Sequence, residues 1–339
     1  MKKYTVVVIG LGNIGLFYDF EPQRLHPATH VMAWEQNPEA ELLCGVDRDT
    51  SRAMKLREVA PLCNFSESIS EAVASYRPDI VSICTPPQFH LSNIEEVFAA
   101  GSPRAIFCEK PLAKNLDEAA RIKRLAEDRK CLVVPNISRR WNSSLRGVFR
   151  KIADERYGRL QKIHVRYTRG IYNTGAHLFD LLRMWTGKKI DLVQTLKKVP
   201  TSSESEGEES FSFFFEQSDG IHGYAEAMND EFYYMFDIDL FFESGKIEMR
   251  DSGNRLLFYG VGTHHLFEGF KELRLETEDK DIFHESCMKH ATQHIVDVLK
   301  GRERPCCTLG DAVYPLQVAM AIEKSSRTKR REKVMYDGW

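Results

Sequence analysis

Three closely spaced glycines follow an apolar run near the start of the chain. Residues 4–9 form the run, and residues 10–15 read Gly-Leu-Gly-Asn-Ile-Gly. In this pattern the first glycine permits a tight turn, the second lets the backbone approach a pyrophosphate, and the third lets the next helix pack closely on the strand. A helix that begins after Gly12 would direct free N–H groups at the phosphates. A sheet-packing turn without a ligand is the alternative. The residues of this predicted dinucleotide site are Gly10, Gly12, Asn13, Ile14 and Gly15.

A carboxylate ends the next apolar run. Residues 41–46 predict a second strand, and Asp47 follows it directly. A carboxylate in this place can accept hydrogen bonds from both hydroxyls of an adenosine ribose and would repel a 2′-phosphate. The guanidinium of Arg48 could stack on adenine and meet a 2′-phosphate. The two residues favour NAD as the cofactor and leave some room for NADP.

The first part of the chain supplies further candidate residues where predicted strands end. Short apolar runs alternate with amphipathic stretches, which indicates βαβ units and a parallel sheet. Ligands bind at the carboxyl ends of the strands in open α/β sheets. We expect Thr85 and Pro86 to lie against the dinucleotide. We expect His90 to pack under its nicotinamide half or to cap a helix.

The last apolar runs of this series lead to Glu109-Lys110-Pro111 and to Arg139-Arg140. Lys110 stands at the carboxyl end of a predicted parallel strand, where a ligand would lie. Glu109 is expected to anchor the loop or to pair with Lys110. One segment, residues 17–27, makes the link from Gly15 to Asp47 longer than a helix and a turn require. It is expected to form a loop near the rim of the cofactor site or an inert surface.

Beyond about residue 160 the pattern changes to alternating apolar and polar residues. Such runs at 162–167, 211–216, 220–227, 233–242 and 246–250 predict an antiparallel sheet. The acidic segment 202–209 is expected to be a solvated hairpin loop. The fold class is therefore α/β, with a first domain over residues 1–135 and a second over residues 136–339. The final helices could pack back on the first domain.

At this point the chain resembles the glucose–fructose oxidoreductase / inositol dehydrogenase / MocA (Gfo/Idh/MocA) family over nearly its whole length. The motifs that carry the resemblance stand in the family's order: Gly10-Leu-Gly-Asn-Ile-Gly15, Thr85-Pro-Pro-Gln-Phe-His90, Glu109-Lys-Pro-Leu112 and Gly175-Ala-His-Leu-Phe-Asp180. The resemblance implies a Rossmann domain, with a doubly wound parallel sheet, followed by an α+β domain with a large open, mostly antiparallel sheet. It also implies pyridine-nucleotide-dependent oxidation of a sugar or cyclitol hydroxyl.

The resemblance gives Lys110 and His177 catalytic roles. Alcohol oxidation removes a proton from the hydroxyl as hydride leaves, and an ammonium near that oxygen stabilises the alkoxide and can relay the proton. The resemblance places Lys110 there and His177 as general base. A solvated lysine and a buried structural histidine are the alternatives. Asp180, one helical turn after His177, is expected to orient it or to cap neighbouring backbone.

Asn173 departs from the family pattern, in which many relatives carry Asp four residues before this histidine. An amide cannot accept a proton at neutral pH, but it can hydrogen-bond a substrate hydroxyl. Asn at this place resembles the branch that oxidises nucleotide-linked N-acetyl-hexosaminuronic acids. Because arginine binds carboxylates and phosphates bidentately, nearby arginines suit an anionic substrate. The predicted substrate-binding residues are Lys110, Arg139, Arg140, Arg169, Asn173 and His177. Arg166 lies on the same strand end as Arg169.

Composition excludes several other classes of protein. The chain has 339 residues, enough for two cores, and its net charge of −2 gives no attraction to nucleic acid or anionic membranes. No apolar run approaches the length of a membrane span. Residues 1–4 lead directly into the first strand, so a cytoplasmic location without a signal peptide is expected. Cys306-Cys307 and His264-His265 lack the spaced partners of a metal site, so no metal is implied.

The leading prediction is an NAD-dependent dehydrogenase that acts on a sugar, sugar acid or nucleotide sugar. Two alternatives remain: an enzyme that holds NAD tightly and ends in isomerisation or glycoside cleavage, and a dinucleotide-binding regulator without turnover. Period-2 alternation places Phe211, Phe213 and Phe215 on one side of their strand, and places Tyr234 and Phe236 together on one side of the run 233–242. The second face of the large sheet is then neither fully polar nor fully apolar, so a homodimer or homotetramer is expected.

Overall fold

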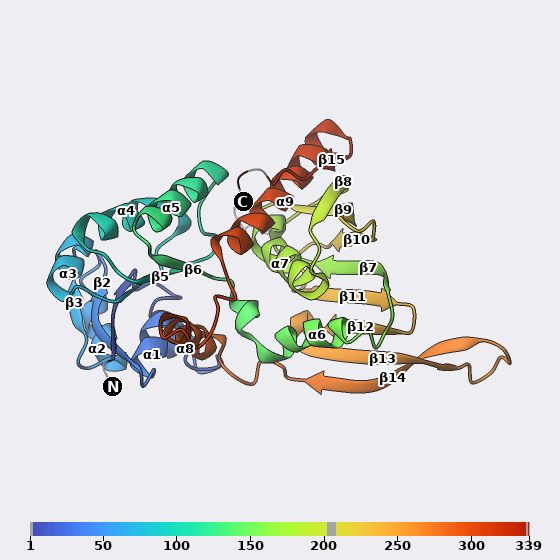
Figure 1. Ribbon diagram of the computed structural model, residues 1–339, viewed down its shortest axis with the longest axis horizontal. Helices are drawn as coiled ribbons and strands as arrows, with labels where there is room; N and C mark the ends of the chain where they lie inside the picture. The colour runs from blue at the N-terminus through green and yellow to red at the C-terminus, as the bar shows by residue number, and fades with distance from the viewer. Residues whose placement is uncertain (1–2, 202–207, 337, 339) are drawn as a thin grey trace. The chain divides into compact units, whose positions relative to one another are not determined.

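The computed structural model describes residues 3–201, 208–336 and 338. Contacts divide the chain into two compact units (Figure 1). The first unit comprises Met1–Asn142 and His284–Val313, and the second comprises Ser143–Phe283 and Tyr314–Trp339. The division into 1–135 and 136–339 stays a prediction about domains; by contacts, a segment after residue 283 belongs with the N-terminal part of the chain.

The first unit contains a parallel sheet with the strand order β3-β2-β1-β4-β5-β6. This order is that of the Rossmann fold, whose crevice lies where the order reverses, between β1 and β4. The predicted doubly wound parallel sheet is confirmed. Its strands are β1 (Tyr4–Ile9), β2 (Ala40–Val46), β3 (Asn64–Ser66), β4 (Ile80–Ile83), β5 (Ala105–Glu109) and β6 (Leu132–Asn136).

Helices cover both faces of this sheet. In Figure 1, α3, α4 and α5 lie together on one face, and α1 contacts α2 and α8 on the other. Their bounds are α1 (His30–Glu35), α2 (Arg52–Val59), α3 (Ile69–Tyr76), α4 (His90–Ala100), α5 (Leu116–Asp128) and α8 (Cys287–Leu299), with the short 3-10 helices η1 (Phe17–Phe20), η2 (Pro87–Phe89) and η3 (Ser138–Trp141).

The helix expected directly after Gly12 is a single turn. The N–H of Leu16 donates to the Gly12 carbonyl at 2.8 Å, and the chain then enters η1 and an irregular loop. The first full helix, α1, begins only at His30, where the Thr29 hydroxyl caps it by accepting from the Met32 N–H. The insertion at residues 17–27 accounts for the difference, because it lies between the glycine turn and the helix.

Asp19 gives the insertion its shape. Its carboxylate accepts from the Ala28 N–H and from His26 Nδ1, both at 2.7 Å, and from the Thr29 hydroxyl. Because Thr29 caps α1, the loop is fixed to the helix that follows it. Tyr18, from η1, lines the cavity described below.

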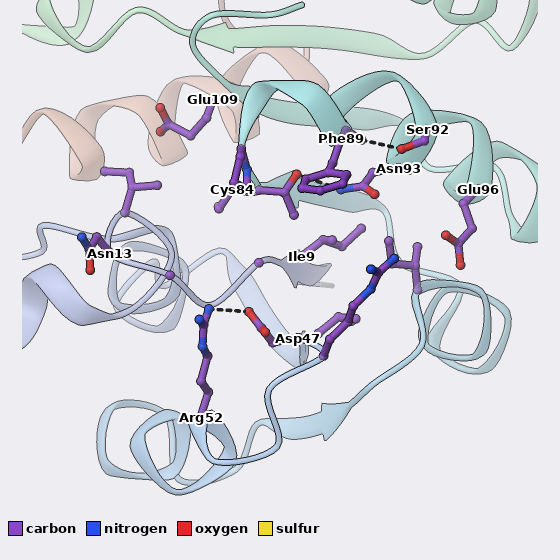
Figure 2. Close-up of a pocket in the computed structure, with 18 of the residues that line it drawn as sticks. Ile9, Asn13, Asp47, Arg52, Cys84, Phe89, Ser92, Asn93, Glu96 and Glu109 are labelled. Carbon is purple, nitrogen blue, oxygen red and sulfur yellow. Dashed lines mark hydrogen bonds and ion pairs between the residues drawn. The ribbon is translucent and has the colours of Figure 1, made fainter. Parts of the chain in front are cut away.

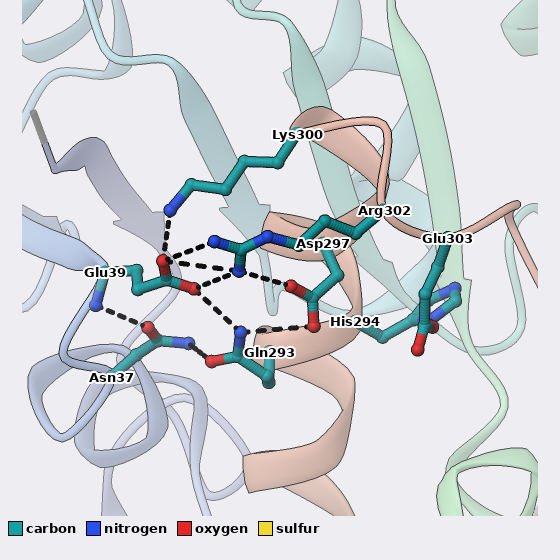
Figure 3. Close-up of polar contacts among 8 residues, drawn as sticks. All are labelled: Asn37, Glu39, Gln293, His294, Asp297, Lys300, Arg302 and Glu303. Atoms are coloured by element: carbon teal, nitrogen blue, oxygen red, sulfur yellow. Dashed lines mark hydrogen bonds and ion pairs between the residues drawn. The ribbon is translucent and has the colours of Figure 1, made fainter. Parts of the chain in front are cut away.

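A charged network attaches α8 to the start of β2 within the first unit. Glu39 accepts hydrogen bonds from Lys300, from Gln293 at 2.9 Å and from Arg302 at 3.1 Å (Figure 3). The Lys300 hydrogen bond first, and those of Gln293 and Arg302 after it, lower the pKa of Glu39 to about 2. Asp297 binds Arg302 from the same helix at 2.9 Å. The carboxylate is therefore ionised and fully occupied.

The second unit contains a large mixed sheet with the strand order β14-β13-β12-β11-β7-β10-β9-β8-β15. Among the strands that the structure describes, only β7 and β10 pair in parallel and the other pairs are antiparallel, so the predicted open, mostly antiparallel sheet is confirmed. The strands are β7 (Leu160–Tyr167), β8 (Ile190–Val199), β9 (Ser210–Gln217), β10 (His222–Ala227), β11 (Phe236–Phe242), β12 (Gly245–Arg250), β13 (Arg255–Thr263), β14 (Lys271–Lys280) and β15 (Glu332–Lys333).

One face of this sheet carries the core of the second unit. Phe211, Phe213 and Phe215 are buried on it, as their alternation predicted, and Phe179 from α7 packs on Phe213 with ring centroids 6.0 Å apart. Trp185 of α7 donates to the Leu145 carbonyl at 2.8 Å. The helical segments of this unit are α6 (Ser143–Ala153), η4 (Gly170–Thr174), α7 (Gly175–Thr186), η6 (Asp251–Gly253) and α9 (Leu309–Thr328), which begins in the first unit.

The strand expected at 233–242 begins only at Phe236. The preceding residues form a loop, and Phe232, Tyr233 and Tyr234 are exposed on it. Tyr234 therefore does not share the core face with Phe236 as the alternation suggested.

The hairpin of β13 and β14 extends past the neighbouring strands (Figure 1). The pairing of β12 with β13 ends at Gly260, so residues 261–273 have only each other as strand partners. We call residues 259–275 the hairpin arm. Val261 pairs with Leu273 and Tyr259 with Leu275 on one face, whereas Gly260 pairs with Arg274 and Gly262 with Glu272 on the other. The arm therefore has one apolar and one polar face.

No helix among the described residues is long and apolar enough to cross a membrane. The acidic segment expected to be a hairpin loop falls mostly on residues 202–207, outside the described residues. All eight cysteines are free thiols.

Candidate cofactor and active site

A cavity of about 840 Å³ opens in the first unit at the carboxyl ends of β1, β2, β4 and β5 (Figure 2). It lies at the point where the strand order reverses, which is where this fold binds ligands. The predicted residues that line it are Gly10, Gly12, Asn13, Ile14, Asp47, Arg48, Thr85, Pro86, Glu109 and Lys110. Gly15 and His90 do not line it. Lining residues that the sequence did not point out include Arg52, Phe89, Ser92, Asn93 and Glu96.

Two of the glycines are required by packing and one is not. Gly10 has φ +91°, and a Cβ on it would lie 2.9 Å from Thr85 N. A Cβ on Gly15 would lie 2.0 Å from the Gly10 carbonyl oxygen. A Cβ on Gly12 would approach only Arg52 Nη1, at 3.8 Å. The protein itself therefore leaves room for a side chain at Gly12. A glycine at this position keeps that space open for a ligand such as a dinucleotide phosphate.

Asp47 holds the glycine turn against the end of β2. Its Oδ2 accepts from the Leu11 N–H at 2.7 Å and from Arg52 Nη1 at 2.8 Å (Figure 2). Each carboxylate oxygen can accept more than one hydrogen bond, so these contacts leave capacity for ribose hydroxyls. Arg52, from the first turn of α2, is the guanidinium that binds Asp47, whereas Arg48 is exposed at the cavity wall. The signal in the sequence that could have pointed to Arg52 was its position five residues after Asp47.

His90 connects two strand-end loops rather than lining the cavity. Its ring is buried, with Nε2 2.7 Å from the Thr85 carbonyl and Nδ1 3.2 Å from the Leu112 carbonyl. Burial lowers the pKa of His90 against the opposing effect of these carbonyls. Asn93, one turn along α4, donates to the Thr85 hydroxyl at 2.8 Å. Both residues fix the Thr85 turn from beneath.

Glu109 and Lys110 end β5 at the cavity. Glu109 Oε2 accepts from the Lys110 N–H at 3.2 Å, and Oε1 accepts from Asn136 at 2.6 Å. Glu109 therefore anchors its loop, in agreement with the geometry expected for it, and Lys110 presents its side chain from a fixed backbone.

In the second unit, a π-helical turn leads into α7. Arg169 has φ +64°, η4 follows it, and α7 starts at Gly175. Asn173 and His177 lie four residues apart across this junction. Such π turns inside helices are frequent at functional sites because they re-aim side chains. Asp180 is buried one turn further on. Lys110 and His177 belong to different units, so their pairing is part of the proposal below.

Two of the four arginines considered for an anionic substrate are held in ion pairs. Arg140 is buried, with Nη2 3.0 Å from Asp311 and Nη1 donating to the Cys306 carbonyl at 2.6 Å. Arg166 binds Asp239 at 3.0 Å on the second unit's sheet. Their contacts suffice to explain both residues structurally. Arg139 is half-buried and Arg169 is exposed.

One group of three possible metal ligands occurs among the described residues: His264, His265 and Glu272, near the end of the hairpin arm. His264 Nδ1 accepts the N–H groups of Leu266 and Phe267, which leaves the ring proton on Nε2, the atom that faces Glu272. These hydrogen bonds explain the group without a metal. The expectation that no metal is implied stays a prediction.

The strand order, the glycine turn and the cavity together define a Rossmann-type nucleotide-binding fold. Residues 4–137 match the Gfo/Idh/MocA family model, described as an oxidoreductase family with an NAD-binding Rossmann fold. Residues 4–137 are therefore similar to the NAD-binding Rossmann domain of this oxidoreductase family, which is also the family that the motifs resemble.

Relatives extend the likeness over both units. An inositol 2-dehydrogenase of Pseudarthrobacter chlorophenolicus is 26% identical over 287 residues, which is 80% of this chain and 81% of that protein. The WlbA dehydrogenase of Chromobacterium violaceum, solved with NADH and UDP-GlcNAcA, superimposes with a TM-score of 0.78 at 18% identity, over 99% of this chain and 97% of that one.

A scyllo-inositol dehydrogenase of Lactobacillus casei, solved with NAD(H) and scyllo-inositol, gives a TM-score of 0.74 at 15% identity, over 98% and 99% of the two chains. At these identities the two structures show a shared fold alone.

Proposed function

We propose that this protein uses NAD to oxidise a hydroxyl group of a sugar-type substrate. The observation that carries the proposal is that Glu109 and Lys110 line the same cavity as the glycine turn and Asp47. A cationic side chain at the carboxyl end of β5 is thereby next to the predicted dinucleotide site.

Side chains of this protein would stabilise the alkoxide and accept the hydroxyl proton during the reaction. NAD, when bound, takes up the hydride. The Lys110 ammonium stabilises the developing alkoxide, and His177 accepts the hydroxyl proton as general base. Asn173 donates or accepts a hydrogen bond with a neighbouring substrate hydroxyl, since an amide cannot itself take up a proton.

NAD is the proposed cofactor, with NADP less favoured. Asp47 bears a negative charge at the wall where an adenosine ribose would lie, and a 2′-phosphate would be repelled there. Arg52 offsets part of that charge at 2.8 Å, which explains why the preference is expected to be finite.

The substrate class proposed is a sugar, a sugar acid or a nucleotide sugar. Arg169, with Arg139 as a second candidate, would bind a carboxylate or phosphate, while Arg140 already has Asp311 as its anion. The inositol dehydrogenase relatives favour a polyol or cyclitol, and the WlbA-like fold is compatible with a uronic acid derivative.

A screen of cofactor reduction tests the proposal. Purified protein would be mixed with NAD and with inositols, sugars, uronic acids and nucleotide sugars, and the absorbance of reduced nicotinamide would be followed. NAD that copurifies and resists dialysis would favour the isomerase or glycosidase alternative. Cofactor binding without reduction across the whole panel would favour the silent regulator.

We also propose that two copies associate through the helix-free face of the second unit's sheet and the hairpin arm. Phe241, Lys246, Tyr259 and Leu275 pair in one row across that face. Asp239 on the same face binds three cationic side chains at 2.6–3.0 Å, so its charges are balanced. A two-stranded ribbon is at best marginally stable in water by itself, and the arm's apolar face is uncovered. A second copy of the chain would stabilise the two-stranded arm and would cover its apolar face.

A further inference from the structure

His30 lies fully buried behind the strand end that carries Lys110. It is the first residue of α1, its side chain is 0% exposed, and Nε2 is 2.9 Å from Glu109 Oε1. Its ring packs on Phe107 of β5, with centroids 4.6 Å apart. Glu109 lines the cavity and directly precedes the proposed catalytic residue Lys110. His30 contacts Glu109 from the side away from the cavity.

A second donor reaches the same carboxylate oxygen. Asn136 Nδ2 donates to Glu109 Oε1 at 2.6 Å. The indole N–H of Trp141, which can only donate, binds Asn136 Oδ1 at 2.8 Å. Trp141 thereby fixes which end of the amide faces Glu109. The other oxygen of Glu109 accepts from the Lys110 N–H at 3.2 Å.

These donors keep the carboxylate of Glu109, whose side chain is 12% exposed, ionised. Burial acts to raise the pKa of Glu109, but the hydrogen bond and charge of His30, with the Asn136 amide and the Lys110 charge, lower it overall. An ionised carboxylate only accepts, so His30 Nε2 carries the proton. His30 Nδ1 is buried and has no hydrogen-bond partner among the described residues. The imidazole ring of His30 therefore hydrogen-bonds through Nε2, the nitrogen that faces Glu109.

The other titratable groups near Glu109 do not replace this donor. Burial first, and the charge of Glu109 second, raise the pKa values of Cys84 and Cys108, so both thiols stay protonated. Both ring nitrogens of His90 are directed at backbone carbonyls. Lys110 contacts Glu109 through its main chain. Removal of His30 would leave Asn136 as the one remaining side-chain donor described.

We propose that His30 is a positioning residue for the reaction. Its N–H, together with the Asn136 amide, holds the Glu109 carboxylate ionised against the main-chain N–H of Lys110 and so fixes the backbone from which the lysine side chain extends. The inference rests on the proposed role of Lys110. When the donor is lost, Glu109 takes up a proton more readily and its hold on the Lys110 backbone weakens.

Two substitutions separate this role from simple packing. His30→Leu removes the donor and keeps an apolar side chain, whereas His30→Gln can return an N–H near the position of Nε2. We expect His30→Leu to lower kcat by roughly tenfold to a hundredfold, as small misplacements do, with KM and NAD affinity within about twofold of the native values. We expect kcat of His30→Leu to recover as pH rises and Glu109 ionises again, and His30→Gln to keep most of the activity.

The matched control is His290→Gln, which alters a histidine–carboxylate pair with Glu285 at 2.6 Å on the surface of α8. It should leave kcat and its pH profile unchanged. A His30→Leu protein with native kcat and pH profile would overturn the inference. So would equal losses in the Leu and Gln variants at every pH, because these indicate packing alone.

A measurement without turnover separates this inference from the proposed function. In protein labelled with [15N]lysine, the Lys110 amide signal, identified by its loss in Lys110→Arg, reports on the Glu109 carboxylate. We expect it to stay constant over roughly pH 5 to 8 in the native protein and to titrate in His30→Leu. If no substrate is ever oxidised, the proposed function fails, yet this signal still decides: constancy in both proteins overturns the role of His30.

Discussion

Lys110 and His177 come from different units, and each has a distinct part in the proposed proton transfer. We expect Lys110→Ala and His177→Ala to bind NAD nearly as the native protein does, because neither residue belongs to the glycine turn. Turnover should fall by about a hundredfold or more, the size of an acid–base contribution. The measurement is kcat on the substrate found in the screen, beside an NAD titration. A variant that retains most of its kcat would remove that residue from the mechanism.

Asp47 is the residue on which cofactor choice depends. We expect Asp47→Asn to weaken NAD binding and to reduce the preference for NAD over NADP by about tenfold or more, because repulsion of the 2′-phosphate is lost while Arg52 remains. The control, Asp49→Asn, alters a neighbouring carboxylate outside the cavity lining. Titrations of both cofactors by fluorescence decide this. Tighter binding of NADP than of NAD to the native protein would contradict the prediction.

The sequence pointed to most cavity residues but not to their partners. Gly10, Asp47 and Lys110 follow apolar runs, so their place at strand ends could be predicted from the pattern. Arg52 and Asn93 line the cavity because they lie on the faces of α2 and α4 that meet the strand ends. A helix face that is turned toward a cavity has no distinct sequence pattern, so neither residue was predicted.

At the level of elements, the buried strands were predictable and the exposed ones were not. Apart from β3, the strands of the parallel sheet are short runs of mostly apolar residues, and the runs expected at residues 4–9 and 41–46 overlap β1 and β2. The sequence of β14 is mostly charged, and β13 contains two glycines, so neither showed an apolar alternation strong enough to be recognised. The helix after Gly12 was expected and is instead a single turn, because the insertion at residues 17–27, which Asp19 holds in shape, follows it.

The contact of α8 with β2 should depend on the charge of Glu39. A carboxyl with a lowered folded-state pKa, about 2 against 4.5, contributes stability that is present above pH 4.5 and is lost as pH falls toward 2. We therefore expect Glu39→Gln to lower the urea midpoint at neutral pH and to differ less from the native protein as the pH falls below 4.5.

Glu41→Gln is the matched control, since Glu41 is an exposed carboxylate in β2, two residues after Glu39. It should unfold at the native midpoint at each pH. A native midpoint for Glu39→Gln at neutral pH would show that the network of Figure 3 adds nothing to stability.

For the molecule as a whole, the hairpin arm makes association testable. We expect the native protein to scatter light as a dimer or tetramer at micromolar concentration. Leu273→Glu with Leu275→Glu should shift it toward the monomer, because burying a large apolar side chain contributes about 1.5–3 kcal/mol and a buried unpaired charge opposes association.

Leu62→Glu, which changes an exposed leucine in the first unit, is the control and should leave the mass unchanged. A native protein that is monomeric by light scattering would refute the association. A double variant with the native mass would move the interface away from the arm.

Because α8 belongs to the first unit but lies late in the sequence, the first unit cannot finish folding until most of the chain has been synthesised. The nucleotide-binding half is discontinuous, and residues 143–283 must be synthesised before its last helix exists. At ribosomal speeds of roughly 5–20 residues per second, that delay is on the order of ten seconds. During this interval the surface of α1 that α8 later contacts has no cover from that helix. The nascent protein is therefore expected to need a chaperone most at this stage, before its C-terminal segment leaves the ribosome.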